Sequence, residues 1–174
     1  MAGKKLEDSV AEHRERSERK AGVAVITLSM SRSLETDKSG DVIQSLLEAN
    51  GHQVLVRKLI PDSRNVLRAT LRELAREKNV QAIITTGGTG LAPMDVTIET
   101  VQGMLDKMLP GFNSLFMLLS YPQVKSASML SRALAGTIKG KIIFCLPGSP
   151  HACKLAMESL ILPELGHILM LLGS

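Results

Sequence analysis

The sequence is poor in aromatic residues and in cysteine, and each shortage argues against a class of function. It has three Phe, one Tyr and no Trp in 174 residues, so single-stranded bases would find little to stack on. The net charge of +4 comes without a dense run of Lys or Arg, so nucleic-acid binding is not expected. Cys145 and Cys153 fit no metal-ligand spacing and are expected to be free, buried or half-buried thiols in a reducing compartment.

The sequence also lacks an apolar run of about 18 residues and a secretory leader, so neither a membrane span nor export is expected. Residues 1–20 hold six Lys or Arg and five Asp or Glu, which predicts a solvated arm without a role in the core. The remaining residues suffice for one domain with a substantial core. We therefore expect a cytoplasmic protein with a charged arm over 1–20 and one domain over 21–174.

Strand and helix patterns alternate through the first two thirds of the domain. The apolar, β-branched stretch 80–84 predicts a buried strand, and 22–28 and 53–60 predict two further strands. A helical pattern follows each of the three. This alternation indicates a parallel sheet with right-handed crossovers. In the helix after the second strand, the residues expected to face the core are Val66, Leu67, Ala69, Thr70, Leu71 and Leu74. In the helix after the third strand, they are Val101, Met104, Leu105 and Met108.

The last third of the chain predicts a different arrangement. Residues 115–119 are apolar without periodicity, and 126–132 predict a short helix. Residues 133–138 and 141–145 then predict a hairpin, and a long helix from His151 closes the chain. The predicted fold is α/β: a three-layer α/β/α domain with a mostly parallel sheet, a C-terminal β-hairpin and a closing helix.

A glycine-rich loop follows the third predicted strand. The loop reads Thr85-Thr86-Gly87-Gly88-Thr89-Gly90 and is followed by Asp95-Val96-Thr97. Glycine allows close approach to the backbone, and loop amides beside a helix N-terminus suit phosphate oxygens. Open α/β sheets bind ligands at the carboxyl ends of their strands, so this loop is the candidate site. A turn that merely leaves a strand is the simpler interpretation of the glycines.

Two other strand ends contribute comparable loops. Asp62 follows the second strand after Pro61, and Pro147-Gly148-Ser149-Pro150 follows the last strand. Asp62 and Asp95 at one sheet edge could hold a divalent cation against a phosphate. The alternative for each acid is a helix N-cap. The dispersed histidines and the absence of a nucleophile-elbow serine argue against nucleophilic catalysis.

Over about residues 9–166 the chain resembles the molybdopterin-binding proteins of molybdenum cofactor biosynthesis, the MoaB/Mog type. The resemblance rests on four motifs in family order: Thr86-Gly87-Gly88-Thr89-Gly90-Leu91-x-Pro93-x-Asp95-Val96-Thr97, Pro110-Gly111-Phe112, Met129-Leu130-Ser131-Arg132-Ala133 and Leu146-Pro147-Gly148-Ser149-Pro150. It implies a three-layer subunit that assembles as a homotrimer or a hexamer. It also implies adenylylation of molybdopterin from Mg-ATP with release of pyrophosphate.

The resemblance also assigns residues to roles. It implies that Asp62 and Asp95 are the catalytic acids and hold Mg²⁺. It implies that pterin and nucleotide phosphates contact ten residues: Thr86, Gly87, Gly88, Thr89, Gly90, Ser131, Pro147, Gly148, Ser149 and Pro150.

The sequence departs from the family pattern at several positions where the family is usually polar. The departures are Met30, Met94, Met108, Asn113, Ser114 and Met117. Met104 and Met108 could simply widen a core-facing stripe, but Met117 and Leu118 leave their segment no polar side. The alternative function is therefore a non-catalytic trimeric scaffold. In it, Met94, Met108, Met117 and Leu118 would dock a second protein in a larger assembly, natural or engineered.

Overall fold

The computed structural model describes residues 19–173, so most of the predicted arm lies outside the described residues. The strands are β1 (Gly22–Leu28), β2 (Gln53–Ile60), β3 (Ala82–Thr86), β4 (Lys107–Met108), β5 (Leu134–Ile138) and β6 (Lys141–Leu146). The helices are α2 (Lys38–Ala49), α3 (Arg64–Leu74), α4 (Thr97–Gln102), α5 (Pro110–Val124), α6 (Pro150–Ala156) and α7 (Leu162–Leu172). Shorter helical turns are η1 (Leu34–Thr36), η2 (Lys125–Leu130) and the π-helical η3 (Met157–Ile161).

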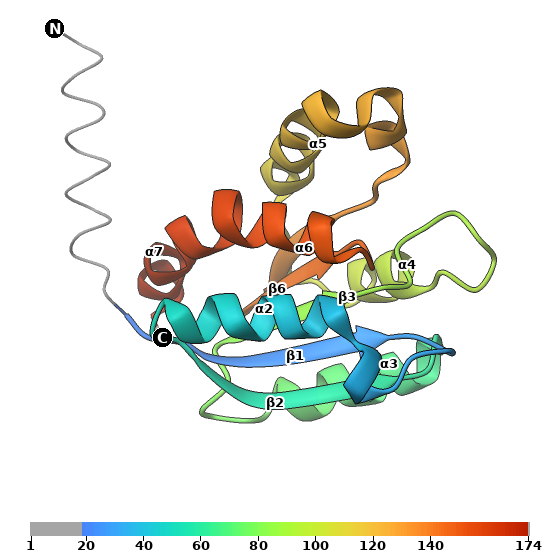
Figure 1. Ribbon diagram of the computed structural model, residues 1–174. Coiled ribbons are helices and arrows are strands. Elements are labelled where there is room, and N and C mark those ends of the chain that lie inside the picture. Colours follow the sequence, from blue (N-terminus) through green and yellow to red (C-terminus); the bar gives the residue numbers. More distant parts are fainter. Residues whose placement is uncertain (1–18, 174) are drawn as a thin grey trace, which may run out of the picture.

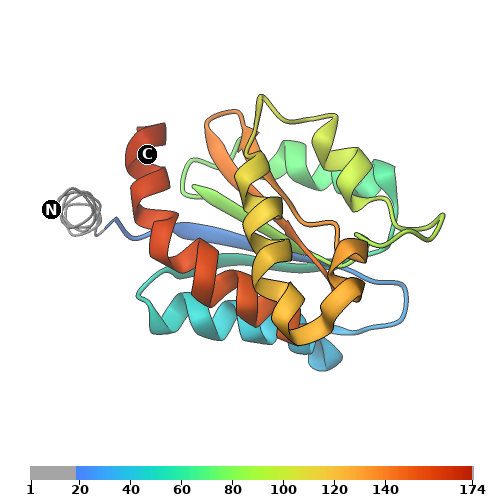
Figure 2. The same cartoon turned by 90° about the horizontal axis from the view of Figure 1, so that it is seen from above.

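One six-stranded sheet has the order β2-β1-β3-β6-β5-β4. The neighbours from β2 to β6 pair in parallel, whereas β5 and β4 are added antiparallel at one edge. Helices α2, α5, α6 and α7 cover one face, and α3 and α4 cover the other (Figures 1 and 2). The predicted three-layer α/β fold and the β5–β6 hairpin are confirmed.

The predicted face of α3 is correct in part. Leu67, Thr70, Leu71 and Leu74 are buried, but Val66 and Ala69 are exposed. Residues spaced by three and four positions already form a stripe wide enough to cover the sheet, so their neighbours on the helix flank stay in solvent.

The prediction for the helix after the glycine loop is wrong beyond Gln102. Gly103 ends α4 there, and only Val101 of the four predicted core residues belongs to the helix. Met104 and Leu105 still pack beside the core from the following turn. Met108 instead lies in β4, where it pairs with Gly136 and is 53% exposed. A two-residue strand has too short a pattern to be recognised in a sequence.

The prediction for the third strand is displaced by two residues. β3 begins at Ala82 and includes Thr85 and Thr86, which were expected in the loop. Both threonines are buried and pair with Cys145 and Leu146 of β6. β-branched threonine suits a strand surrounded by other strands, which explains the shift.

The aperiodic stretch 115–119 is helical and belongs to α5. Phe112, Phe116 and Ser120 are buried, whereas Leu115 and Leu118 are 50% and 67% exposed. The helix is therefore apolar on both its buried and its exposed sides, which conceals its period in the sequence. The predicted short helix before Arg132 is the 3-10 turn η2.

The closing helix begins one residue before the predicted start. Its N-cap is Ser149, whose side chain accepts a hydrogen bond from the Ala152 N–H. Within the described residues, the helical stretch Pro150–Leu172 is long and apolar enough to cross a membrane by length and composition alone. That composition is also typical of a core helix. The buried face of this helix supplies Cys153, Ala156, Met157, Ile161, Leu165 and Leu169 to the main core cluster.

Candidate functional site

An open cleft of about 550 Å³ lies at the carboxyl ends of all four parallel strands. The loops after β1, β2, β3 and β6 all reach it, as predicted for ligand sites of open α/β sheets. The residues that line it are Leu28, Ser29, Met30, Ser31, Arg32, Asp62, Gly87, Gly88, Thr89, Gly90, Met94, Asp95, Leu130, Ser131, Pro147, Gly148 and Ser149. Ten of the twelve residues predicted for the site line this cleft; Thr86 and Pro150 do not.

The glycine loop requires its glycines for two separate reasons. Gly87 has φ +95°, and a Cβ atom there would lie 2.3 Å from the carbonyl oxygen of Leu28. Gly88 has φ +61°, and a Cβ atom there would lie 2.6 Å from Thr97 Oγ1 and 2.9 Å from Asp62 Oδ1. The backbone at Gly88 therefore approaches the Asp62 carboxylate closely, and any larger residue would fill that part of the cleft.

The loop is anchored on its inner side. The Thr97 hydroxyl donates to the Gly87 carbonyl at 2.8 Å, and the Thr97 N–H donates to the Gly88 carbonyl at 2.9 Å. In contrast, within residues 19–173 the backbone N–H groups from Gly88 to Leu91 donate no hydrogen bond to the protein. A run of free amides at a cleft wall is the arrangement that binds anions such as phosphate.

Asp62 is not a helix cap. The N-cap of α3 is Ser63, which makes no side-chain capping bond, and Asp62 lines the cleft instead. Removal from water raises the pKa of the Asp62 carboxyl, the charge of Asp95 raises it further, and the Met30 N–H lowers it. Asp62 and Asp95 both line the cleft, so the two predicted acids are brought together there.

Asp95 is not a helix cap either. The N-cap of α4 is Val96, whereas Asp95 Oδ2 accepts a hydrogen bond from the Ala92 N–H at 2.9 Å. The Asp95 N–H donates in turn to the Ala92 carbonyl at 2.9 Å. These two bonds close the end of the glycine loop and hold the second carboxylate over Gly90, where a Cβ atom would be 2.6 Å from Asp95 Oδ2.

Thr86 supports the site from within the sheet. Its hydroxyl donates to the Pro147 carbonyl at 2.9 Å and lies 3.3 Å from Cys153 Sγ. Thr86 therefore links the glycine loop to the loop after β6, where Pro150 is the first residue of α6. Both cysteines are free and buried, as predicted, and burial raises the pKa of the Cys153 thiol to about 11.

Sequence reasoning did not assign the loop after β1 to the site, and it did not foresee that the N-cap of α2, Asp37, is a buried acid behind that loop. Ser29, Ser31 and Arg32 line the cleft, and the Gly148 carbonyl accepts from Arg32 Nη2 and Ser39 Oγ. The fully buried Asp37 accepts from the Thr27 hydroxyl at 2.6 Å, the Gly40 N–H at 3.0 Å and Arg57 Nη2 at 3.1 Å. The strand-end rule that found the other three loops would also have found this one.

A second pocket of about 430 Å³ adjoins the cleft and shares Ser131 with it. Met108, Met117 and Met129 line it, together with Ser114, Asn113 and Arg132 among others. Met30 and Met94 line the main cleft and are 73% and 65% exposed. Leu118 lines neither pocket and points to solvent. The predicted docking surface is therefore not one continuous surface. Met94, Met108 and Met117 lie in the cleft or in the pocket beside it, whereas Leu118 lies outside both.

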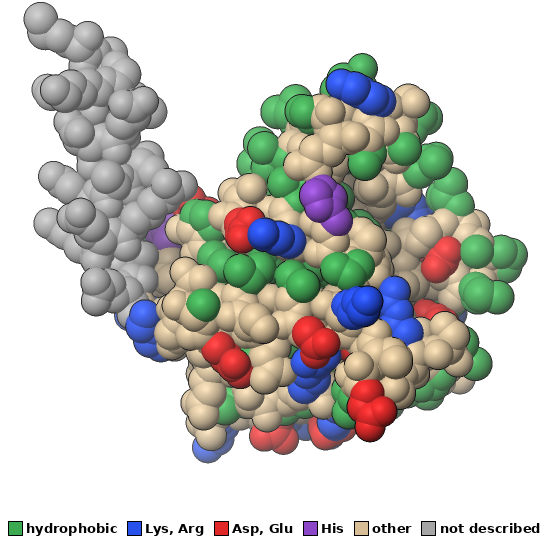
Figure 3. Space-filling model, in the orientation of Figure 1, with side chains coloured by type: hydrophobic (Ala, Val, Ile, Leu, Met, Phe, Trp, Pro, Cys, Tyr) green, Lys and Arg blue, Asp and Glu red, His purple; other side chains and the backbone are tan. Residues whose placement is uncertain are grey.

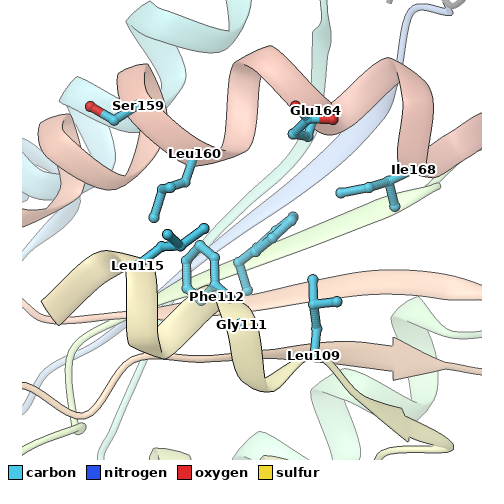
Figure 4. Close-up of a pocket in the computed structure, with 9 residues that line it drawn as sticks. Leu109, Gly111, Phe112, Leu115, Ser159, Leu160, Glu164 and Ile168 are labelled. Carbon is cyan, nitrogen blue, oxygen red and sulfur yellow. The ribbon is translucent and has the colours of Figure 1, made fainter. Parts of the chain in front are cut away.

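A third hollow, of about 380 Å³, lies on the other side of α5. Figure 4 shows that Phe112 and Leu115 of α5 face Leu160 and Ile168 of the closing helix. Leu109, which precedes α5, lines the same hollow. Glu164 and Ser159 add polar groups to an otherwise apolar groove. Figure 3 shows hydrophobic side chains gathered over the α5 projection that forms one wall of this groove.

The donor set of the cleft suits Mg²⁺ as the companion of a phosphate ligand. Among the described residues, no group of three or more His, Cys, Asp or Glu could form an all-protein metal cage. Magnesium is commonly held by one or two carboxylates together with substrate phosphates and water. The Asp62 and Asp95 carboxylates beside free backbone amides fit that pattern.

The fold and the cleft define an α/β ligand-binding domain with its site at the carboxyl ends of parallel strands. Comparison with known families shows a match over residues 24–167 to the family described as "Probable molybdopterin binding domain". The chain belongs to this family, as the motifs predicted, and is thus a protein of molybdenum cofactor biosynthesis.

Relatives agree with that assignment. Molybdenum cofactor biosynthesis protein B of Halalkalibacterium halodurans is 43% identical over 162 residues, covering 92% of this chain and 95% of its own. The tungsten cofactor synthesizing protein MoaB from Pyrococcus furiosus superposes with a TM-score of 0.79 at 35% identity, covering 90% of this chain and 99% of its own. A crystal structure of a molybdenum cofactor biosynthesis protein B superposes with a TM-score of 0.87 at 41% identity, covering 90% and 98%.

Proposed function

We propose that the protein transfers AMP from Mg-ATP to molybdopterin and releases pyrophosphate. One observation carries the proposal: two carboxylates, Asp62 and Asp95, share a cleft with the free backbone amides of Gly88, Thr89 and Gly90. Amides suit phosphate oxygens, and the carboxylates suit the cation that accompanies a nucleoside triphosphate. Membership of the molybdopterin-binding family supports the choice of the second substrate. We place this reaction in the cytoplasm, as expected from the sequence.

The cleft residues would divide the work between binding and charge neutralisation. The free amides of Gly88, Thr89 and Gly90 would hold phosphate oxygens, while Ser131, Gly148 and Ser149 would complete the walls. Asp62 and Asp95 would hold Mg²⁺, which when bound neutralises the negative charge of the phosphates. Thr86 and Pro150 do not line the cleft and would support it instead. Thr86 binds the loop after β6 through the Pro147 carbonyl, and Pro150 begins the helix that follows this loop.

The direct test is a turnover assay with purified protein, molybdopterin, ATP and Mg²⁺, following pyrophosphate and the adenylylated pterin. We expect both products in equal amounts and none without Mg²⁺. Molybdopterin binding without either product would contradict the proposed transfer and favour a binding role. Absence of both turnover and molybdopterin binding would remove the substrate assignment altogether.

The exposed apolar side chains favour a second candidate, the trimeric scaffold that docks another protein. Leu118, Tyr121 and Met94 are 67%, 56% and 65% exposed, and α5 projects from the domain (Figure 1). Soluble monomers rarely expose contiguous apolar patches beyond a few hundred Å². We propose that a homotrimer or hexamer covers part of this surface and that a second protein covers the rest. Light scattering of the purified chain, alone and with candidate partners, tests this directly.

A further inference from the structure

Arg132 joins the glycine loop to the helix that follows it. Its Nε donates to the Thr89 carbonyl at 2.9 Å, and its Nη2 donates to the Gly90 carbonyl at 2.5 Å. The remaining nitrogen, Nη1, bonds Glu99 Oε1 in the first turn of α4 at 2.5 Å. All three guanidinium nitrogens are therefore used, and 28% of the side chain remains exposed.

These bonds fix the direction of two loop amides. Within one trans peptide unit the C=O and N–H groups point in opposite directions. Holding the Thr89 and Gly90 carbonyls on the Arg132 side therefore turns the N–H groups of Gly90 and Leu91 away from Arg132. Gly90 lines the main cleft, whereas Arg132 lines the adjoining pocket of about 430 Å³ and not the cleft.

Only arginine suits this task among the charged side chains. Its planar fork presents several N–H groups at fixed spacing and can hold two carbonyls and a carboxylate together. A lysine in its place would keep the positive charge, but its ammonium group is a compact point charge without that geometry.

We propose that Arg132 is a positioning residue that orders this part of the glycine loop and so pre-organises the Gly90 amide for a phosphate group of the ligand. The inference rests on the proposed phosphate-binding role of the cleft. Arg132 acts through the loop and does not line the cleft itself. Pre-organised donors cost less to order when the ligand binds, so the effect should appear as affinity for phosphate compounds.

The test uses Arg132→Lys, Arg132→Gln and Glu99→Gln in the full chain, with inorganic pyrophosphate and ATP as separate calorimetric probes. Arg132→Lys and Arg132→Gln should each weaken pyrophosphate binding about tenfold, as expected when hydrogen bonds to a charged group are lost. Glu99→Gln keeps both carbonyl bonds and should change affinity by less than about threefold, since Glu99 is 41% exposed. Wild-type affinity in Arg132→Lys would overturn the inference, because charge alone would then suffice.

A ligand-free measurement keeps this inference separate from the proposed function. We expect NMR order parameters of the Gly90 and Leu91 amides of about 0.85 in the wild-type chain and below about 0.6 in Arg132→Gln. Unchanged order parameters in Arg132→Gln would overturn the positioning role, even if affinity fell. If the wild-type chain binds neither probe, the proposed function fails, and the order parameters still decide the role of Arg132.

Discussion

The loops of the cleft and the α5 projection are built in opposite ways. Each cleft loop follows a parallel strand, and buried polar groups such as Asp37, Thr86 and Thr97 hold this region together through hydrogen bonds. The α5 projection instead exposes large apolar side chains and is held to the domain mainly by Phe112 and Phe116. A hydrogen-bonded cleft fixes atoms for chemistry, whereas an exposed apolar surface is suited to contact with another molecule.

The largest effect is expected from filling the glycine loop. Gly88→Val should abolish binding of molybdopterin and of ATP, because its side chain would occupy the space between Thr97 and Asp62. The positive φ at Gly88 also adds a backbone cost of about 1–2 kcal/mol for a non-glycine residue. Calorimetry with each ligand gives the result. Gly140→Val is the matched control, because Gly140 also has positive φ but nothing lies within 4 Å of its Cβ position.

Gly140→Val should therefore show a comparable backbone cost without the steric overlap, and it should keep ligand binding. Unchanged molybdopterin affinity in Gly88→Val, or equal loss in both variants, would contradict the assignment of the glycine loop as the phosphate site.

The second effect concerns the two carboxylates. Asp62→Asn or Asp95→Asn should lower turnover by about 10²–10⁴, provided the chain adenylylates molybdopterin, because each removes a charge needed for the cation or for proton handling. The turnover assay with ATP and Mg²⁺ measures it. Asp41→Asn is a suitable control, because Asp41 is an exposed acid that pairs with Arg57 away from the cleft. Equal rates for wild type and both cleft variants would remove the two acids from the mechanism.

The sequence predicted the strand-end loops because their signals are local. A glycine run or a proline after a buried strand marks the end of that strand, and parallel pairing places such ends together. Thr86 was assigned to the loop because β-branched residues suit both a strand and its exit. Its role became visible only through the Pro147 contact, which joins positions 61 residues apart.

The buried supports could not be predicted for the same physical reason. Arg57 and Arg132 act through long-range bonds that no local pattern records. Asp37 caps α2 locally, but its bonds to Thr27 and Arg57 are not local. Likewise, the apolar character of α5 was visible in the sequence, but the division between Met117 in a pocket and Leu118 in solvent depends on helix orientation.

The third effect tests the buried acid that supports the cleft. Asp37→Ala should lower the free energy of unfolding by about 3 kcal/mol, because it leaves the Thr27 hydroxyl, the Gly40 N–H and the Arg57 guanidinium without their buried partner. Chemical denaturation measures the change. Asp41→Ala removes the exposed partner of the same Arg57 and should cost less than about 1 kcal/mol. Equal costs would show that burial of Asp37 adds nothing.

The fourth effect tests the α5 surface. If a second protein or a second trimer covers it, Leu118→Arg should abolish the larger species and leave a folded trimer, since a buried apolar anchor contributes roughly 1–3 kcal/mol. Light scattering reports the assembly, and circular dichroism reports the fold. Val66→Arg places the same charge on α3, which covers the other face of the sheet, and should change nothing. Identical masses for wild type and Leu118→Arg would mean that no other molecule covers Leu118.

The smallest effect concerns the pKa of Asp62, which burial raises and the charge of Asp95 raises further. A folded carboxyl with a raised pKa binds more protons than the unfolded chain, so the free energy of unfolding falls as pH rises from about the ordinary value of 3.8 through the folded pKa. Above that window Asp62 is ionised, and its charge lowers the free energy of unfolding. The carboxylate is nevertheless needed for its proposed role in the site. Asp62→Asn should therefore raise the melting temperature at neutral pH and make no difference below the window.

The expected rise is about 1 °C, because the cleft is open to water and 1 kcal/mol corresponds to about 2–4 °C in a domain of this size. Thermal unfolding from pH 3 to pH 8 measures it. Asp95→Asn should show part of the same gain, since it removes the like charge, and the pKa of Asp62 should then fall in an NMR titration. A lower melting temperature for Asp62→Asn at pH 7 would mean that the hydrogen bond from the Met30 N–H outweighs the removal of this carboxylate from water.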